Sequence, residues 1–232
     1  FKTSSIWWKY SLSTFSLNFF ETTFVNSVDL INVVILWFIK FFPRNSLQAL
    51  LPLRGGSKGI PKKNIKLFNG YPLYYWTANA VCKANIPLNI STDNQEISSI
   101  VEKYTPSAKI IKRPEKFAQD ASSTEDVIKH FITVEKCEHI LLIQATSPLT
   151  NESHIKDAVN LYFRNNCKPL ISGTIQHKFI WGKNGIPNNY DPLKRPRRQD
   201  WEGDFVENGA LYLFSKKDFM RSECRCVPPC TL

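Results

Sequence analysis

From residue 47 onward, short apolar segments alternate with amphipathic ones, and this alternation restricts the fold of the chain more than any other feature. Four amphipathic segments have helical periodicity, and they lie near residues 72–84, 94–104, 122–136 and 151–166. The apolar segments have the length and composition of strands, and they are Leu47–Leu53, Leu88–Ser91, Ala108–Ile111, His139–Gln144, Leu170–Ile175 and Ala210–Phe214. Strands that alternate with helices form parallel sheets covered on both faces. The sequence therefore predicts an α/β fold, a three-layer sandwich with a mainly parallel sheet.

Two helix starts are marked by the spacing of a capping box, in which one side chain accepts an N–H three residues later and a glutamate there reaches back. The pairs are Asp93 with Glu96 and Ser122 with Glu125. We therefore expect Asp93 to cap a helix, and we favour this role over a catalytic one.

The first predicted strand leads into the sequence RGGSKGIPKKNIK at residues 54–66. Paired glycines allow a turn with positive φ, and glycines let a phosphate approach main-chain N–H groups. The glycines of this stretch are Gly55, Gly56 and Gly59. Its positive charge comes from Arg54, Lys58, Lys62 and Lys63. The spacing matches neither GxxxxGK[ST] nor GxGxxG, which excludes a Walker-type ATPase and a Rossmann dehydrogenase. A polyphosphate site is the functional interpretation, and a solvated glycine turn is the alternative.

Positive charge is concentrated at two places in a chain whose formal net charge is +10. Five Lys and Arg residues lie between Arg54 and Lys66, and four more lie between Lys194 and Arg198. Such clusters suit a nucleoside triphosphate, an acidic sugar, nucleic acid or an import receptor. The sequence lacks the interleaved aromatics and the recognition motif of a nucleic-acid-binding module, so only charge supports that alternative and no nucleic acid is expected.

Length and composition suit one domain with an appendage, since the chain has 232 residues of which 43% are apolar. We expect the domain at 47–220, an N-terminal extension at 1–46 and a cysteine-rich tail at 221–232. The tail holds a C-x-C-x3-C pattern with no further histidine or thiol, so we do not expect a zinc site. The earlier cysteines are typical of reduced, packed thiols in an intracellular protein, and they are Cys82, Cys137 and Cys167.

The N-terminal extension contains the apolar stretch FVNSVDLINVVILWFIKFF at residues 24–42. It has about the length of a minimal membrane span, but four polar or charged residues interrupt it. A membrane anchor, a packed amphipathic segment and sequence upstream of the true start all remain open. No cleavable signal peptide is expected, because polar residues follow the first lysines.

Residues 178–204 have little regular pattern and several glycines and prolines, which predicts a functional loop or an arm that contacts a partner. The run from Lys194 to Arg198 within it reads as a nuclear localisation signal, and an exposed basic loop is the alternative.

Five stretches occur in one order, and together they resemble the acylneuraminate cytidylyltransferases, the CMP-sialic acid synthetases. They are RGGSKGIPKKN at 54–64, ISTDNQEI at 90–97, KRPEKFAQDASSTED at 112–126, IQATSP at 143–148 and KRPRRQDWEGDFVENGALY at 194–212. The last stretch is closer to the animal-type enzymes than to the bacterial ones. The resemblance covers about residues 47–220.

The resemblance implies a fold of the nucleotide-diphospho-sugar transferase (GT-A-like) type and a reaction of CTP with sialic acid, with Mg²⁺ as cofactor. It also implies a homodimer with an arm near residues 150–200, and a nuclear or cytoplasmic location. The alternative location is a membrane, through residues 24–42. The nucleotide-binding residues would be Arg54, Gly55, Gly56, Ser57, Lys63, Asn64, Arg113 and Ser123, and the catalytic ones Arg54 and Lys63.

The acidic sugar would be bound by Gln144, Arg197 and Asn208. Several of these assignments have structural alternatives: a surface arginine for Arg113, a helix cap for Ser123 and a strand-end amide for Gln144.

The sequence departs from the family pattern at its end, where RSECRCVPPCTL replaces an acidic D-x-D element that binds metal in the family. We therefore expect a chain truncated at its C-terminus, with its metal ligands unknown. A catalytically silent member that binds CTP or a partner subunit, and a relative that activates another nonulosonic or Kdo-like acid, are the alternative functions.

Overall fold

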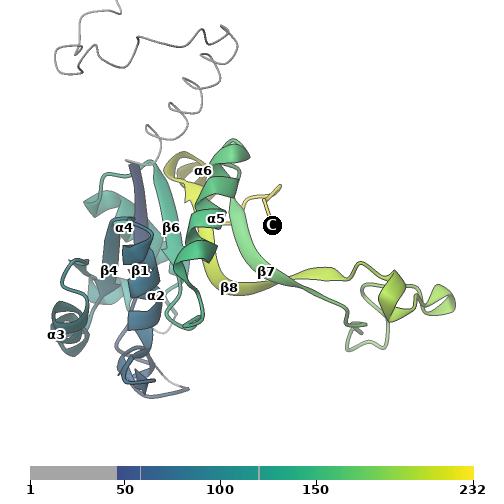
Figure 1. The fold of residues 1–232 in the computed structure, drawn as a ribbon, viewed down its shortest axis with the longest axis horizontal. Coiled ribbons are helices and arrows are strands. Elements are labelled where there is room, and N and C mark those ends of the chain that lie inside the picture. The colour runs from purple at the N-terminus through teal and green to yellow at the C-terminus, as the bar shows by residue number, and fades with distance from the viewer. Residues whose placement is uncertain (1–45, 58, 120) are drawn as a thin grey trace, which may run out of the picture. The chain divides into compact units, whose positions relative to one another are not determined.

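A six-stranded mixed sheet forms the centre of the computed structural model, which describes residues 46–57, 59–119 and 121–232 (Figure 1). The strand order is β5-β4-β1-β6-β8-β7. The strands are β1 (Leu47–Pro52), β4 (Leu88–Thr92), β5 (Lys109–Lys112), β6 (His139–Ile143), β7 (Leu170–Gln176) and β8 (Asp204–Ser215). Strands β5, β4, β1 and β6 are parallel, and β8 runs antiparallel to both β6 and β7. The predicted α/β fold with a mainly parallel sheet is confirmed.

Helices cover both faces of the sheet, as predicted. On one face, buried residues of α2 (Leu73–Lys83), α3 (Gln95–Tyr104) and α5 (Glu152–Arg164) pack in one cluster with the sheet. On the other face, α4 (Thr124–Val134) and α6 (Lys216–Ser222) pack in a second cluster, in which Phe131 and Phe219 are almost fully buried. A small hairpin of β2 (Leu67–Phe68) and β3 (Tyr71–Pro72) precedes α2.

Strand β8 is longer than its apolar pattern predicted, because it begins at Asp204 rather than at Ala210. Its first half pairs with the second half of β7, in the register Gly173 with Glu207 through Gln176 with Asp204, beyond an irregularity between Ile171 and Gly173. These residues lie at the sheet edge, where main-chain pairing does not require a buried, apolar face. The sequence pattern therefore did not reveal them.

Both predicted helix caps are wrong by one residue. Asn94, and not Asp93, caps α3, since its Oδ1 accepts the Ile97 N–H at 3.0 Å. Ser123, and not Ser122, caps α4 in a capping box with Asp126. In each case two adjacent side chains are equally good caps, and the tertiary structure selects the one whose oxygen faces the helix N–H groups.

The residues between β7 and β8 form an arm that extends away from the sheet (Figure 1). Its only helical turns within the described residues are η4 (Pro192–Lys194) and η5 (Arg198–Asp200). Aromatic rings hold it together, because Phe179 stacks on Trp201 with centroids 4.8 Å apart. The Arg195 guanidinium lies over the Phe179 ring, 4.1 Å from its centroid. The prediction of an irregular segment here is confirmed.

The last ten residues pack against the sheet. The Thr231 N–H donates to the Pro169 carbonyl at 2.7 Å, and the Ile171 N–H donates to the Thr231 carbonyl at 3.0 Å. Arg225 forms an ion pair with Glu125 in the first turn of α4.

The interpretations of residues 1–45 as an extension or a membrane anchor, and the assignment of Lys58, lie outside the described residues. Within the described ranges, no helix is long and apolar enough to cross a membrane.

Candidate functional site

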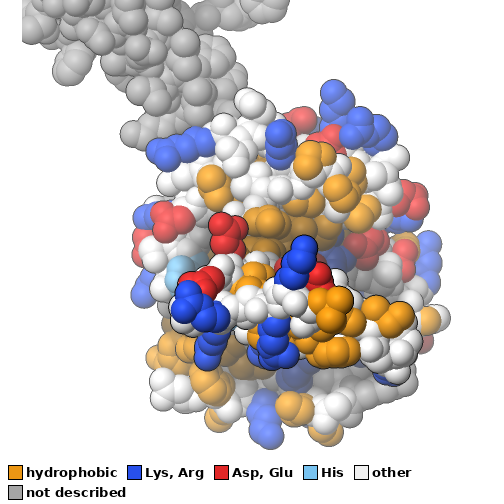
Figure 2. Space-filling view, turned by 90° about the vertical axis from the view of Figure 1, so that its right-hand side faces the viewer, with side chains coloured by type: hydrophobic (Ala, Val, Ile, Leu, Met, Phe, Trp, Pro, Cys, Tyr) orange, Lys and Arg blue, Asp and Glu red, His pale blue; other side chains and the backbone are white. Residues whose placement is uncertain are grey.

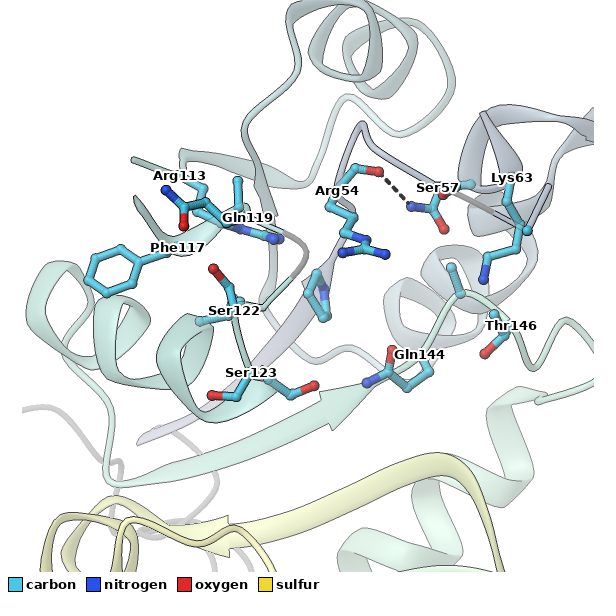
Figure 3. A pocket seen from close by; sticks show the side chains of 17 residues that line it. Arg54, Ser57, Lys63, Arg113, Phe117, Gln119, Ser122, Ser123, Gln144 and Thr146 are labelled. Carbon is cyan, nitrogen blue, oxygen red and sulfur yellow. Dashed lines mark hydrogen bonds between the residues drawn. The ribbon is translucent and has the colours of Figure 1, made fainter. Parts of the chain in front are cut away.

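A cavity of about 330 Å³ lies beside the carboxyl ends of the parallel strands. The chain runs from β1 outward through β4 to β5, and then returns to β6 on the other side of β1. Ligands of open α/β sheets bind outside the strand ends at such a reversal. Three loops supply the walls, and they follow β1, β5 and β6 (Figure 3).

The first wall is the loop that we call the phosphate loop, residues 54–57 and 59–64. Arg54, Ser57, Lys63 and Asn64 line the cavity, and the Arg54 and Lys63 side chains both extend into it (Figure 3). Asn64 is buried, and its Nδ2 donates to the Arg54 carbonyl at 3.1 Å. This bond joins the two ends of the loop, so it holds the two cationic side chains on one side of the cavity.

Gly55 and Gly56 lie in the same loop but do not line the cavity. The Gly55 N–H donates to the Asp93 carboxylate at 3.1 Å, so it is already bonded without a ligand. Neither glycine has positive φ, which differs from the expected turn, and the left-handed residue of the loop is Lys62 with φ of 52°. Gly55 is required for another reason, since an added Cβ would lie 2.7 Å from Nδ2 of Asn94.

Arg113 follows β5 and is buried, with 5% of its surface exposed, which rules out the surface-arginine alternative. Its Nε donates to the Ser91 hydroxyl at 3.1 Å and its Nη2 to the Ser91 carbonyl at 2.6 Å. Burial lowers the pKa of Arg113 to about 10; the nearby Asp93 carboxylate opposes this shift and the Arg54 guanidinium adds to it. Arg113 therefore stays positively charged at neutral pH at the base of the cavity.

The rest of the second wall is the segment from Phe117 to Thr124. Ser123 lines the cavity, but its hydroxyl accepts the Asp126 N–H and donates to the Asp126 carboxylate at 2.8 Å. The helix-cap alternative for Ser123 is therefore confirmed. The sequence interpretation missed Phe117, Gln119 and Ser122, which also line the cavity. Their position after a predicted strand, at the ligand-binding edge, is the signal that could have identified them.

Gln144 follows β6 and lines the cavity with Thr146 (Figure 3). The Gln144 N–H donates to the Ala210 carbonyl at 3.0 Å, which fixes the main chain. No hydrogen bond of the Gln144 side-chain amide is found among the described residues, so it is available to a ligand. Thr146 was not predicted as a site residue.

Arg197 and Asn208 are not brought to the cavity of the same chain. Arg197 lies in the arm at the start of η5, where its Nε forms an ion pair with Asp200. Asn208 lies on β8, and its Oδ1 accepts hydrogen bonds from the Ser172 hydroxyl at 2.7 Å and the Ala210 N–H at 2.9 Å. Within one chain, only Gln144 of the three predicted sugar ligands lines the cavity.

The described residues of the cavity wall contain no carboxylate. Among the described residues of the whole chain, no three His, Cys, Asp or Glu side chains form a group that could hold a metal ion. Mg²⁺ binds through carboxylate and phosphate oxygens, so the described wall does not fit a protein ligand set for it.

The cavity combines cationic side chains with hydroxyl and amide groups and one aromatic ring. Guanidinium and ammonium groups bind phosphate through charge-assisted hydrogen bonds. The ring of Phe117 is already in contact with its own segment and α4, because the Lys116 ammonium lies 4.8 Å from its centroid and the His130 ring 5.5 Å away. This arrangement suits a nucleotide better than a simple apolar ligand.

A family model described as "Cytidylyltransferase" matches residues 48–226. The N-acylneuraminate cytidylyltransferase A of Danio rerio is 39% identical over 184 residues, which cover 75% of this chain and 42% of that protein. The N-acylneuraminate cytidylyltransferase of Oncorhynchus mykiss is 35% identical over 188 residues, covering 77% of this chain and 43% of that protein. The chain thus spans less than half the length of these curated relatives.

Solved structures share the fold at low sequence identity. A CMP:2-keto-3-deoxy-manno-octonic acid synthetase complexed with CTP matches with a TM-score of 0.57 and 13% identity, covering 76% of each chain. A 4-diphosphocytidyl-2C-methyl-D-erythritol synthase from Anaerococcus prevotii matches with a TM-score of 0.55 and 15% identity, covering 78% of this chain and 75% of that one. These matches confirm the predicted fold type.

Proposed function

Because the chain belongs to the cytidylyltransferase family, we propose that it is a nucleotidyltransferase that couples CTP to an N-acylneuraminate, giving CMP-sialic acid and pyrophosphate. The observation that carries the proposal is the cavity at the β1–β6 reversal, where Arg54, Lys63 and Gln144 meet. The names and the identity of the fish relatives support sialic acid as the acceptor sugar.

In this reaction the anomeric hydroxyl of the sugar attacks the α-phosphorus of CTP. A new O–P bond forms, the bond between the α-phosphorus and the bridging oxygen breaks, pyrophosphate leaves and the hydroxyl loses its proton. Such transfers depend mainly on positioning and on stabilisation of phosphate charge. We assign that stabilisation to Arg54 and Lys63, which are the cationic side chains of the phosphate loop that line the cavity.

The remaining nucleotide contacts are assigned by position. Ser57 lies beside the triphosphate and Asn64 at the ribose, while Gly55 and Gly56, which do not line the cavity, act through the shape of the loop. Arg113 and Ser123 belong to the opposite wall, where the base would bind. Gln144 contacts the acidic sugar.

Mg²⁺, the cofactor expected from the resemblance, is not supplied with ligands by the described residues, so the roles above are those of this chain's side chains alone. The match of the family model to residues 48–226 supports a catalytic domain that begins near residue 47, after an extension at 1–46. The tail at 221–232 is proposed to be atypical of the family in its cysteine-rich sequence, although the family model reaches residue 226 and the tail packs on the domain.

We also propose a homodimer in which the arm of one chain completes the site of the other. In support, Arg197 and Asn208 lie away from the cavity of their own chain, and the arm projects beyond the sheet (Figure 1). Hydrophobic side chains gather beside lysines and arginines on the face that carries the arm (Figure 2). Such a surface suits a contact with a second copy.

Mixing two inactive variants tests this arrangement. Arg54→Ala and Arg197→Ala remove groups from the two halves of the proposed composite site. If the arm acts on the partner, a mixed dimer holds one site with both arginines, and mixing the variants under exchange conditions restores about a quarter of the wild-type activity. A monomer in sedimentation analysis, or no recovery in exchanged dimers, contradicts the proposal.

The basic run from Lys194 to Arg198 is proposed as the surface read by a nuclear import receptor. Its four basic residues are exposed in the single chain. A fluorescent fusion of the whole chain should concentrate in the nucleus, and the double variant Lys194→Ala/Arg198→Ala should not. Equal distributions of the two fusions refute this signal.

Pyrophosphate release tests the central proposal. We expect release only with CTP and N-acetylneuraminic acid together, in a buffer with Mg²⁺, and its loss in Arg54→Ala. Arg164→Ala, on the exposed side of α5, is the matched control and should retain the activity. Binding of CTP without release would favour a catalytically silent member. Preferential release with another nonulosonic acid would change the substrate.

A further inference from the structure

We propose that Asp93 is a positioning residue that holds the phosphate loop in its binding shape. This inference rests on the proposed function for its nucleotide-binding part, while its structural part stands on the loop itself. Asp93 is not assigned as a catalytic residue, because it does not line the cavity.

The position of Asp93 follows from the pairing of β1 with β4. Pro52 pairs with Ser91, and the Leu53 N–H continues this contact by donating to the Ser91 carbonyl at 2.8 Å. The phosphate loop therefore leaves β1 directly beside the residues that follow β4. There the Gly55 N–H donates to Oδ1 of Asp93 at 3.1 Å.

The main chain of the loop lies so close to this junction that only glycine fits at position 55. A Cβ on Gly55 would lie 2.7 Å from Nδ2 and 2.9 Å from Cβ of Asn94. Asn94 has little freedom to move, since its Oδ1 caps α3. The loop thus packs on a fixed surface, and Asp93 supplies the polar contact to it.

A second contact joins the other end of the loop to the same junction. The Lys62 ammonium lies 2.7 Å from the Glu96 carboxylate in the first turn of α3. Both side chains are substantially exposed, at 65% and 48%, so this ion pair contributes little by itself. Together with the bond from Asn64 to the Arg54 carbonyl, it leaves the loop held at both ends.

The charges around Asp93 explain why a carboxylate suits this place. Arg113 is anchored to Ser91, two residues before Asp93, and Arg54 begins the loop that Asp93 holds. Two guanidinium groups at one site repel each other without a bound anion, and a carboxylate between strand and loop reduces this repulsion. The Asp93 carboxylate accepts the Gly55 N–H and does not line the cavity. It can therefore reduce the repulsion between the guanidinium groups without filling the part of the cavity where phosphates would bind.

Two substitutions of Asp93 separate its hydrogen-bond acceptor from its negative charge. Asp93→Ala removes both the acceptor and the charge, whereas Asp93→Asn keeps an oxygen that can accept the Gly55 N–H. Asp157→Ala, an exposed aspartate on α5, is the matched control. We expect Asp93→Ala to weaken CTP binding about fivefold in calorimetry, since one exposed hydrogen bond to a charged acceptor is lost. We expect Asp93→Asn to remain within about twofold of the wild type.

Hydrogen–deuterium exchange supplies a readout that needs no nucleotide. Amide protection at residues 55–57 should fall in Asp93→Ala and be retained in Asp93→Asn and Asp157→Ala. Unchanged protection and unchanged CTP affinity in Asp93→Ala overturn the inference, and so does an Asp93→Asn variant that loses as much as Asp93→Ala. If the wild type binds no CTP, the proposed function fails, and the exchange data alone decide whether Asp93 holds the loop.

Discussion

The Arg113 guanidinium is fixed to Ser91, donating from Nε to its hydroxyl at 3.1 Å and from Nη2 to its carbonyl at 2.6 Å. Ser91 lies on β4 and is fully buried, so a cation at the cavity base is held by the main sheet rather than by a loop. The binding site and the stability of the fold are therefore linked at this pair.

Arg113→Lys should destabilise the chain by about 1–3 kcal/mol. A lysine cannot make both bonds to Ser91, and its ammonium would be buried with incomplete hydrogen bonding. Urea denaturation measures the loss, with the exposed Arg164→Lys as the control that should stay within about 0.5 kcal/mol of the wild type. Equal midpoints for the two variants would contradict the structural role of the Ser91 contacts.

Gly55→Ala and Gly56→Ala should differ in stability although the two residues are adjacent. A Cβ at Gly55 meets the Asn94 side chain at 2.7 Å, whereas a Cβ at Gly56 meets nothing within 4 Å. We expect Gly55→Ala to cost about 1–3 kcal/mol through overpacking and a disturbed helix cap. Thermal unfolding of the two variants tests this, and a Gly56→Ala variant that is the less stable of the pair would refute it.

Ser123→Ala should lower stability by about 1 kcal/mol, because the hydroxyl is the N-cap of α4. Ser123→Asn should restore most of this loss, since asparagine is an equally good cap. The measurement is chemical denaturation of both variants. If Ser123→Asn restores stability but not CTP affinity, Ser123 has a nucleotide contact besides its cap. Unchanged stability in Ser123→Ala would count against the capping box.

Stability should decrease as the pH falls below about 6.5, in part because of His139. Burial lowers the pKa of His139 from its ordinary 6.5, and its Nδ1 lies 2.9 Å from the Tyr162 hydroxyl. Below pH 6.5 the unfolded chain binds a proton that the folded chain does not accept until a lower pH, so unfolding becomes more favourable. Burial and the nearby charges of Arg113 and Lys116 lower the pKa of His130 in the same direction.

Urea midpoints at pH 7.5 and 5.5 measure this effect. His139→Gln should reduce the difference between the two midpoints, while His177→Gln, at an exposed position in the arm, should leave it as in the wild type. A His139→Gln variant with the full wild-type difference would exclude His139 as a source of the pH dependence.

Much of the site could be predicted because it follows from strand ends. Arg54, Arg113 and Gln144 each come after a strand that apolar composition identifies, and parallel strands bring such residues to one edge. Phe117, Gln119 and Thr146 were missed, because their residue types carry no specific signal for a ligand. Arg197 was assigned to the sugar, yet its ion pair with Asp200 lies in the arm, away from the cavity of its own chain.

The sequence by itself determined the α/β class, five of the six strands of the main sheet to within one residue at each end, and the polar loops at the sheet edge. These features depend on local apolar patterns and on where each pattern stops. Only the tertiary structure decided that Asn94 rather than Asp93 caps α3, that Asp93 instead holds Gly55, and that Arg113 is buried against Ser91. The physical reason is that the bonds of Asp93 to Gly55 and of Arg113 to Ser91 join segments far apart in the chain, and their geometry exists only once β1, β4 and β5 lie side by side. With Asp93 bonded to Gly55, the local cap of α3 is supplied by Asn94.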